Sequence, residues 1–530
     1  MLNSKKFITL ILTTSFALTA CGGGSNDNKA GTPATGNSGG NPAMVWVQGQ
    51  FTPYLELAGQ CSANQTGTTL IEKLWMRSWS NDTYLWYDEI IDRDPAPYSV
   101  SEYFDLLITN ELSDSGNAKD VFHFSMPTDE WEQLNQSGAS VGYGFNFQLI
   151  NRDQNIERNV TVTYNEPGTP AATANIDRGA VIVEIDGVSV QNANDSTSID
   201  ILNAGLFPSE TGKQTVFTIR DLGATADRDV TLTAQTIVST PVQNIKTLQT
   251  TDGTVGYLQF NAHIATAERG LFDAFTTLSQ AGVDDLILDV RYNGGGLLAM
   301  ASQLSYMIAG ETATANRTFE STRFNDKYPT KDPVTHETLT PMPFIDETLG
   351  FNSGLLAAGS ALPTLDLERV YVLTTAGTCS ASESIMNSLR GVDIEVIQIG
   401  GTTCGKPYGF YPTPNCDTTY FTIQFQGIND KGFGDYSDGL FPSSSPTLAS
   451  EIPGCMLDDD LFHALGDTDE RLLSAALYYR TNARCPATVA SMAKVAATSE
   501  FIDDGYILKD PRNQTVIKNN RIITDIKGAL

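Results

Sequence analysis

The sequence has 530 residues, which is room for three to four domains of about 150 residues each. Hydrophobic residues make up 41% of it and charged residues 18%, the balance of a globular protein with a substantial core. The formal net charge of −29 argues against nucleic acid or an anionic membrane surface as a partner, because both attract clustered cations. The 4 histidines are far apart in sequence, so we expect no catalytic zinc site. The sequence patterns taken together imply no metal or organic cofactor.

The chain begins with the pattern of a secretory signal. Lys5 and Lys6 form a short positive region, and residues 7–18 are mostly apolar. This run is shorter than the roughly 20 apolar residues that a membrane-spanning helix needs. We therefore predict a signal peptide over residues 1–20 and export of the rest of the chain.

The end of this signal resembles a bacterial lipobox. The run Leu18-Thr19-Ala20-Cys21 has that pattern, and the resemblance implies cleavage before Cys21 and attachment of lipid to its sulfur. Residues 21–45 are rich in Gly, Ser and Asn and are expected to form a flexible tether. Gly22 fits the pattern of outer-membrane sorting, so we expect a periplasm-facing or cell-surface protein that contacts the membrane only through its lipid. An ordinary signal peptide with a cysteine at its boundary is the alternative.

Of the 7 cysteines, an even number remains besides Cys21, which favours up to three disulfides in an oxidising compartment. We favour a Cys404–Cys416 pair, because these two residues are close in sequence. A thiol nucleophile is the competing interpretation, although no His neighbours any Cys in sequence. The remaining cysteines are Cys61, Cys379, Cys404, Cys416, Cys455 and Cys485.

Residues 46–135 are predicted to form a small N-terminal helical domain. Thr69 and Glu72 have the spacing of a capping box, and Trp75 and Trp79 follow at helical spacing. We interpret these apolar side chains as the core stripe of that domain.

Residues 136–240 change to short β-like runs separated by turn signals. The order of a glycine-containing loop, a strand, a small-residue helix start and a strand ending in Ile-Asp-Gly resembles a PDZ domain. Such modules bind peptide C-termini by adding the peptide as a strand. The resemblance implies that Gly142, Tyr143, Gly144 and Phe145 form the peptide-binding loop. A plain β-rich linker domain is the alternative.

Residues 241–490 alternate between strand and helix patterns, which predicts an α/β core with a mostly parallel sheet and crossover helices. Continuous apolar runs predict buried strands, each followed by a turn. Residues 491–530 are expected to form a C-terminal extension. The predicted core elements are strands over 285–290, 369–375 and 394–399, a helix that begins near 297 and ends at Gly310, and a helix over 380–390.

Chemically distinctive groups follow these three strands. The loop Asn293–Gly296 follows the first, Ser380 the second and Lys406 the third. Because the carboxyl ends of parallel strands meet at one edge of a sheet, we expect a hydroxyl, an amine and a glycine loop with exposed N–H groups to lie together. These are the nucleophile, base and oxyanion hole of an acyl-transfer site.

The same segments resemble the three signatures of the C-terminal processing (tail-specific) serine peptidases. The matching segments are Leu288–Gly296, Ser380–Glu383 and Cys404–Lys406, in the family's order, and the resemblance covers roughly residues 68–445. It implies a ClpP/crotonase-like core. It also implies that Ser380 is the nucleophile, that Lys406 is the general base, and that the N–H of Ala381 with that of Gly295 or Gly296 forms the oxyanion hole.

The base requires a neutral lysine. The usual pKa of Lys, about 10.4, must fall by several units, which burial away from water can achieve. Glu383 shares a helix face with Ser380 and is, by the resemblance, a candidate third catalytic residue. We expect it to orient rather than to contact Lys406, because a nearby carboxylate raises the pKa of an amine. Relatives place Gln four residues after the lysine, where this chain has Phe410, so the third role stays open.

Other interpretations compete at each motif. Ser380 and Glu383 have the spacing of an ordinary capping box. Gly400–Lys406 is nearly a phosphate-binding P-loop, but Pro407 replaces the required Ser or Thr. His263 could serve as a base, although a structural histidine is the more common case.

Together these patterns predict a lipid-anchored serine endopeptidase that cleaves polypeptides by a Ser–Lys mechanism and recognises their C-termini. The alternative is a catalytically inactive surface lipoprotein that binds peptides or glycans. The sequence does not decide the substrate or the oligomeric state.

Overall fold

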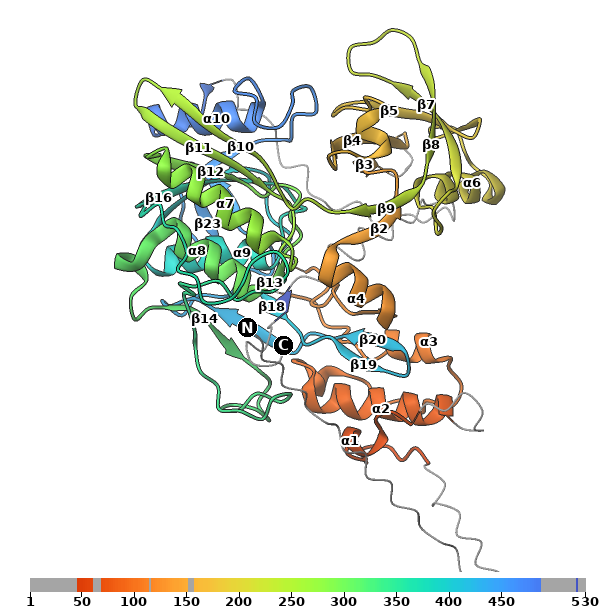
Figure 1. Ribbon diagram of the computed structural model, residues 1–530. Coiled ribbons are helices and arrows are strands. Elements are labelled where there is room, and N and C mark those ends of the chain that lie inside the picture. The colour runs from red at the N-terminus through yellow and green to blue at the C-terminus, as the bar shows by residue number, and fades with distance from the viewer. Residues whose placement is uncertain (1–44, 61–67, 114–115, 151–156, 488–520, 523–530) are drawn as a thin grey trace, which may run out of the picture. The chain divides into compact units, whose positions relative to one another are not determined.

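The computed structural model describes residues 45–60, 68–113, 116–150, 157–487 and 521–522 (Figure 1). The predicted signal peptide, the tether up to residue 44, Cys21 and Cys61 lie outside the described residues, as does nearly all of the predicted extension 491–530. Among the helices of the described residues, none has both the length and the apolar character needed to cross a membrane.

The core is a seven-stranded sheet in the order β10-β11-β12-β16-β17-β23-β22. Only the β10–β11 pair is antiparallel, and the other neighbours are parallel, as the alternating pattern predicted. The strands are β10 Val242–Thr250, β11 Gly253–Phe260, β12 Asp285–Asp289, β16 Arg369–Thr374, β17 Glu395–Gly400, β22 Phe441–Ser443 and β23 Glu451–Met456.

Helices cover both faces of this sheet, because successive strand residues point to opposite sides. Leu286 and Leu288 pack in a cluster with α7, α8 and α9, whereas Ile287 packs with α10. Gly310 has φ +75° and breaks the helical geometry of α8 where the sequence predicted its end, although the assigned helix continues to Thr314. The four helices are α7 Ala267–Gln280, α8 Leu298–Thr314, α9 Ala381–Gly391 and α10 Arg471–Asn482.

The N-terminal segment contains several helices, and one strand of it forms a separate sheet with two strands from residues 413–421. Strand β1 Phe124–Pro127 pairs with β20 Thr418–Phe421, which pairs with β19 Thr413–Asn415. Trp75 and Trp79 are buried, and the ring of Trp75 lies 5.4 Å from that of Tyr420. The helices are α1 Tyr54–Leu57, α2 Thr68–Thr83, the 3₁₀ helix η1 Tyr87–Glu89, α3 Val100–Asp105 and α4 Thr128–Ser137.

The β-rich segment has its own sheet and its own core. The sheet order is β3-β4-β5-β7-β8, with β6 paired to β5, while β2 pairs with β9. Helix α6, which the sequence patterns did not place, packs Leu202 and Leu206 into the core of this segment. The elements are β2 Ala139–Gly142, β3 Phe145–Ile150, β4 Asn159–Asn165, α5 Pro170–Thr173, β5 Val181–Ile185, β6 Val188–Ser189, α6 Ser196–Leu206, β7 Gln214–Arg220, β8 Arg228–Thr233 and β9 Gln235–Val238.

Short strands complete the fold beside the core sheet. Four of them form a sheet in the order β15-β14-β21-β18, and β13 pairs with β24. They are β13 Gly296–Leu297, β14 Thr318–Arg323, β15 Met342–Pro343, β18 Tyr408–Gly409, β21 Phe425–Ile428 and β24 Arg521–Ile522.

Candidate active site

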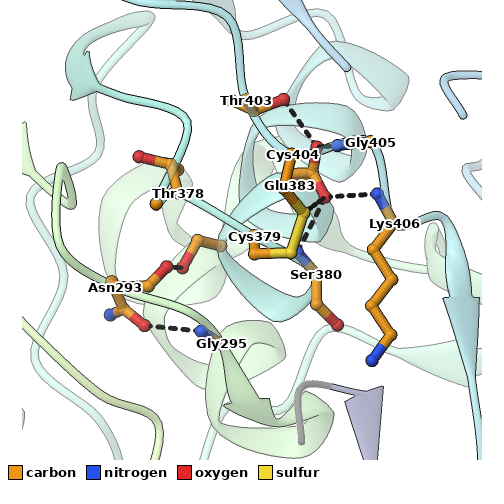
Figure 2. The surroundings of a disulfide bond; sticks show 12 residues. Asn293, Gly295, Thr378, Cys379, Ser380, Glu383, Thr403, Cys404, Gly405 and Lys406 are labelled. Carbon is orange, nitrogen blue, oxygen red and sulfur yellow. Dashed lines mark hydrogen bonds between the residues drawn. A yellow bond between two sulfur atoms is a disulfide. The ribbon is translucent and has the colours of Figure 1, made fainter. Parts of the chain in front are cut away.

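Ser380 and Lys406 follow two neighbouring parallel strands. Ser380 comes after β16 and immediately before α9, and Lys406 comes after β17 in the stretch that leads to β18. Both residues are completely buried. Figure 2 shows the serine hydroxyl and the lysine amine directed to the same side, away from Glu383. The strand-edge argument therefore predicted their common location from the sequence.

The backbone of Ser380 is in an unusual conformation. Its φ is +58° and its ψ is −110°, values that cost energy for a residue with a side chain. Such a conformation persists only where the surroundings hold it, and residues in sparsely populated regions of φ/ψ space cluster at functional sites. The turn before α9 is thus built to present Ser380 in one orientation.

Glu383 joins the serine turn to the lysine loop. Its Oε2 accepts hydrogen bonds from the backbone N–H of Ser380 at 2.7 Å and of Lys406 at 2.9 Å. Its Oε1 accepts from the Gly405 N–H at 2.9 Å and from the Thr403 hydroxyl at 2.5 Å. Burial raises the pKa of this carboxyl group, and these four donors oppose that shift. The bond to the Ser380 N–H is half of the capping box that the sequence offered as the ordinary interpretation.

The amine of Lys406 lies against two aromatic rings. Its Nζ is 4.5 Å from the ring centroid of Phe410 and 4.7 Å from that of Phe122. Phe410, four residues after Lys406, is therefore one of the two rings beside the amine. Phe122 comes from the N-terminal segment, and no local sequence pattern marked it.

The glycine loop is fixed by Asn293. Its Oδ1 accepts from the N–H of Gly295 at 2.9 Å, and its Nδ2 donates to the carbonyl of Phe260 at 2.9 Å. Its backbone carbonyl accepts from the Cys379 N–H at 3.1 Å and from the Ser382 hydroxyl at 3.0 Å, which attaches the loop to the serine turn. The Gly295 N–H, one of the predicted oxyanion donors, is therefore engaged with Asn293 in this structure. The other predicted donors belong to Ala381, which begins α9, and to Gly296 in β13.

His263 contacts both Asn293 and Gly295 of this loop. Its Nδ1 lies 3.1 Å from Asn293 Oδ1, and its backbone N–H donates to the Gly295 carbonyl at 2.9 Å. Complete burial lowers its pKa to about 4, so the ring is neutral at physiological pH. These contacts fit the structural interpretation of His263.

The disulfides differ from the predicted pairing. Cys379 is bonded to Cys404, with their Cα atoms 5.2 Å apart, so the Cys404–Cys416 prediction is wrong. Closeness in sequence was the wrong criterion, because the ends of β16 and β17 bring residues 379 and 404 together across 25 positions of chain. A second disulfide joins Cys455 to Cys485. All four of these sulfurs are oxidised, which leaves none of them available as a thiol nucleophile.

The predicted peptide-binding loop, Gly142–Phe145, runs from the last residue of β2 to the first residue of β3 in the β-rich segment. Gly144 has φ +90°, and a Cβ there would come within 2.2 Å of the Thr169 side chain, so only glycine fits. The Tyr143 hydroxyl donates to Thr215 Oγ1 at 2.8 Å. Strand β3 is at the edge of the described sheet and pairs with β4 alone. This loop belongs to a different part of the chain from the cluster around Ser380.

Comparison with known proteins identifies what this arrangement is similar to. Residues 254–429 match the family model of Peptidase family S41. The chain is 30% identical to the chloroplastic C-terminal processing peptidase of Tetradesmus obliquus over 185 residues, 32% of this chain and 38% of that protein. It is 27% identical to the carboxyl-terminal-processing protease of a Synechocystis species over 207 residues, 38% of this chain and 46% of that protein.

A solved structure extends the likeness of fold over most of the chain. An S41 protease from Bacteroides fragilis matches 77% of this chain and 97% of its own with a TM-score of 0.57 at 22% identity. The chain spans less than half the length of the curated relatives it matches. The predicted resemblance to the C-terminal processing peptidases, a class of serine-type peptidases, is confirmed by these matches for the segment 254–429.

Proposed function

We propose that this protein is a serine endopeptidase in which Ser380 attacks a peptide carbonyl and Lys406 serves as the general base. The observation that carries the proposal is that two completely buried residues, one bearing a hydroxyl and one an amine, follow adjacent parallel strands and donate through their backbones to one carboxylate oxygen. The family match of residues 254–429 supports the same activity.

The proposed reaction balances with these two side chains and water. Lys406 Nζ takes the proton of the Ser380 hydroxyl as its oxygen attacks the carbonyl, and N–H donors from Ala381 and the glycine loop stabilise the oxyanion. The lysine then gives its proton to the leaving amine, so that an acyl-enzyme and a free amino terminus form. A water molecule releases the acyl group by the same steps, again with Lys406 as base. Burial favours this role, because it disfavours the ammonium form of an amine.

Substrate capture is assigned to the β-rich segment. The proposal rests on the position of β3 at the edge of the described sheet and on the tight loop Gly142–Phe145 at its start, the two features with which PDZ-like modules hold a peptide C-terminus. A polypeptide with a free α-carboxylate should then be cleaved with a lower KM than the same polypeptide with an amidated terminus. Equal KM values for the two substrates would contradict this assignment.

Lipid anchoring at Cys21 and a ClpP/crotonase-like core stay predictions from the sequence. For the anchor, metabolic labelling with a fatty-acid analogue should modify the wild-type protein and not the Cys21→Ala variant. Labelling of both proteins, or of neither, would contradict the lipobox interpretation.

Labelling with a serine-reactive phosphonate tests the proposed function directly. The expected result is a single modified residue, Ser380, found by mass spectrometry, together with hydrolysis of an unfolded protein. Ser380→Ala and Lys406→Ala should abolish both signals while circular dichroism stays unchanged. Ser444→Ala, a control at an exposed serine, should behave as wild type. Peptide binding without labelling or turnover would instead favour the inactive binding lipoprotein.

A further inference from the structure

A disulfide connects the two segments that carry the groups of the proposed reaction. Cys379 immediately precedes Ser380, and Cys404 is two positions before Lys406, so the Cys379–Cys404 bond joins the two segments that carry them (Figure 2). Neither segment is held by regular secondary structure at this point, since residues 375–380 and 401–407 lie outside the helices and strands. Their relative position depends on tertiary contacts.

We propose that the Cys379–Cys404 disulfide is a positioning element for the Ser380–Lys406 pair, so that peptidase activity requires the oxidised bond. The inference rests on the proposed function, because it assigns the bond a task in that reaction. It concerns alignment, and neither sulfur is assigned contact with the substrate.

The non-covalent contacts that hold the lysine segment to the serine turn and to α9, which follows it, depend heavily on one group. Three of them, from Thr403, Gly405 and Lys406, end on the carboxylate of Glu383. Burial raises the pKa of that carboxyl group, and its protonated form is the weaker acceptor. One backbone bond, from the Cys404 N–H to the Thr378 carbonyl at 3.0 Å, adds to them. The disulfide is the covalent connection among these contacts and does not change with the protonation of Glu383.

Loss of the bond should act on the chemical step. A nucleophile and base that lose alignment by about 1 Å can lose about 100-fold in rate, while contacts that bind the rest of the substrate stay intact. Reduction by dithiothreitol transfers two electrons and two protons. The dithiol closes into its own cyclic disulfide, and Cys379 and Cys404 each become a thiol. We expect dithiothreitol to attack the sulfur of Cys404, because Cys404 is half-buried whereas Cys379 is fully buried.

The test compares oxidised and reduced wild-type enzyme with two double variants. Cys379→Ala/Cys404→Ala removes the proposed positioning bond, and Cys455→Ala/Cys485→Ala removes the other described disulfide as a matched control. Each protein is assayed for kcat and KM on an unfolded protein, for phosphonate labelling, and for folding by circular dichroism. EDTA is present throughout, because the ligand atoms of Cys379, Glu383 and Cys404 lie within 4.8 Å of one another and freed thiols could capture a metal ion.

We expect reduction to lower the kcat of the wild type by about tenfold or more with little change in KM, and reoxidation to restore it. The Cys379→Ala/Cys404→Ala variant should have the low kcat with or without dithiothreitol. The Cys455→Ala/Cys485→Ala control should have wild-type activity that dithiothreitol still lowers. If the Cys379→Ala/Cys404→Ala variant does not fold, the test is the reversible loss of kcat when the wild-type enzyme is reduced and reoxidised.

Two results would overturn the inference, and they are distinguishable. Unchanged kcat in folded, reduced wild type, with reduction verified by thiol alkylation of Cys379 and Cys404, would remove the positioning role and leave the proposed function standing. Absence of both Ser380 labelling and turnover in the oxidised wild type would reject the proposed function and, with it, the inference.

Discussion

The Nζ atom of Lys406 lies 4.7 Å from the ring centroid of Phe122, a buried residue of the N-terminal segment. Phe122 is placed there by the neighbouring strand β1, which pairs with β20 of the core. The surroundings of the amine are therefore built from two distant parts of the chain, and Phe410 supplies the second ring.

The first prediction concerns this ring. Phe122→Ala should let water reach Lys406 and favour its ammonium form, so the acid limb of the kcat/KM profile should move to higher pH by about one unit. The loss of the cation–ring contact acts in the opposite direction but is the smaller effect. Phe122→Leu, which keeps the site apolar, should shift the profile less. A profile for Phe122→Ala that matches wild type would show that this ring does not set the protonation of the base.

The second prediction concerns Glu383. In Glu383→Gln one acceptor oxygen becomes an N–H₂ donor that faces backbone N–H groups, so we expect a loss of about 1–3 kcal/mol of stability and a lower kcat. Glu102→Gln changes the same kind of capping box at Ser99 on the surface and is the matched control. Chemical denaturation and steady-state kinetics measure both effects. Equal losses of stability and of kcat in the two variants would mean that Glu383 acts only as a helix cap.

The third prediction is a pH dependence of stability. The pKa of His263 is about 4 in the folded state and about 6.5 when unfolded, so the unfolded state takes up a proton first. The free energy of unfolding should therefore fall as the pH drops from 6.5 to 4, by about 3 kcal/mol for this residue. His263→Gln should remove that part of the dependence, as urea denaturation at a series of pH values would reveal. Parallel curves for variant and wild type would contradict the neutral, buried ring.

The fourth prediction concerns a buried charge beside the glycine loop. Arg291 donates to both oxygens of Glu470, at 2.8 and 3.0 Å, and to Asp289 at 2.9 Å, and all three residues are buried. Arg291→Met would leave these carboxylates without their buried cationic partner and should cost about 3–5 kcal/mol of unfolding free energy. The exposed Arg269–Asp273 pair provides the control, since Arg269→Met should change stability little. Denaturation midpoints that agree for the two variants would refute the prediction.

The sequence was informative where chemistry follows local pattern. The apolar runs placed β12, β16 and β17 to within a residue or so, and the strand-edge argument then located Ser380 and Lys406 together. The same argument applies to Cys379 and Cys404, which flank those two residues. The wrong disulfide was predicted because the cysteines were paired by their distance along the chain and not by this strand-edge argument.

Contacts that depend on pairing between distant segments were not predictable in this way. Phe122 reaches Lys406 only because β1 pairs with β20, and no period or turn signal in either segment specifies that register. The hydrogen bond from the Gly295 N–H to Asn293 was not predictable either. A glycine run predicts exposed N–H groups, but it does not predict which of them will donate to a neighbouring side chain.

The β1–β20 pairing has a consequence for the newly made protein. Until that strand docks, the ring of Phe122 is missing from beside the Lys406 amine, and an amine open to water keeps its proton at neutral pH. In the proposed function, Lys406 would then serve as a base only after β1 has paired with β20.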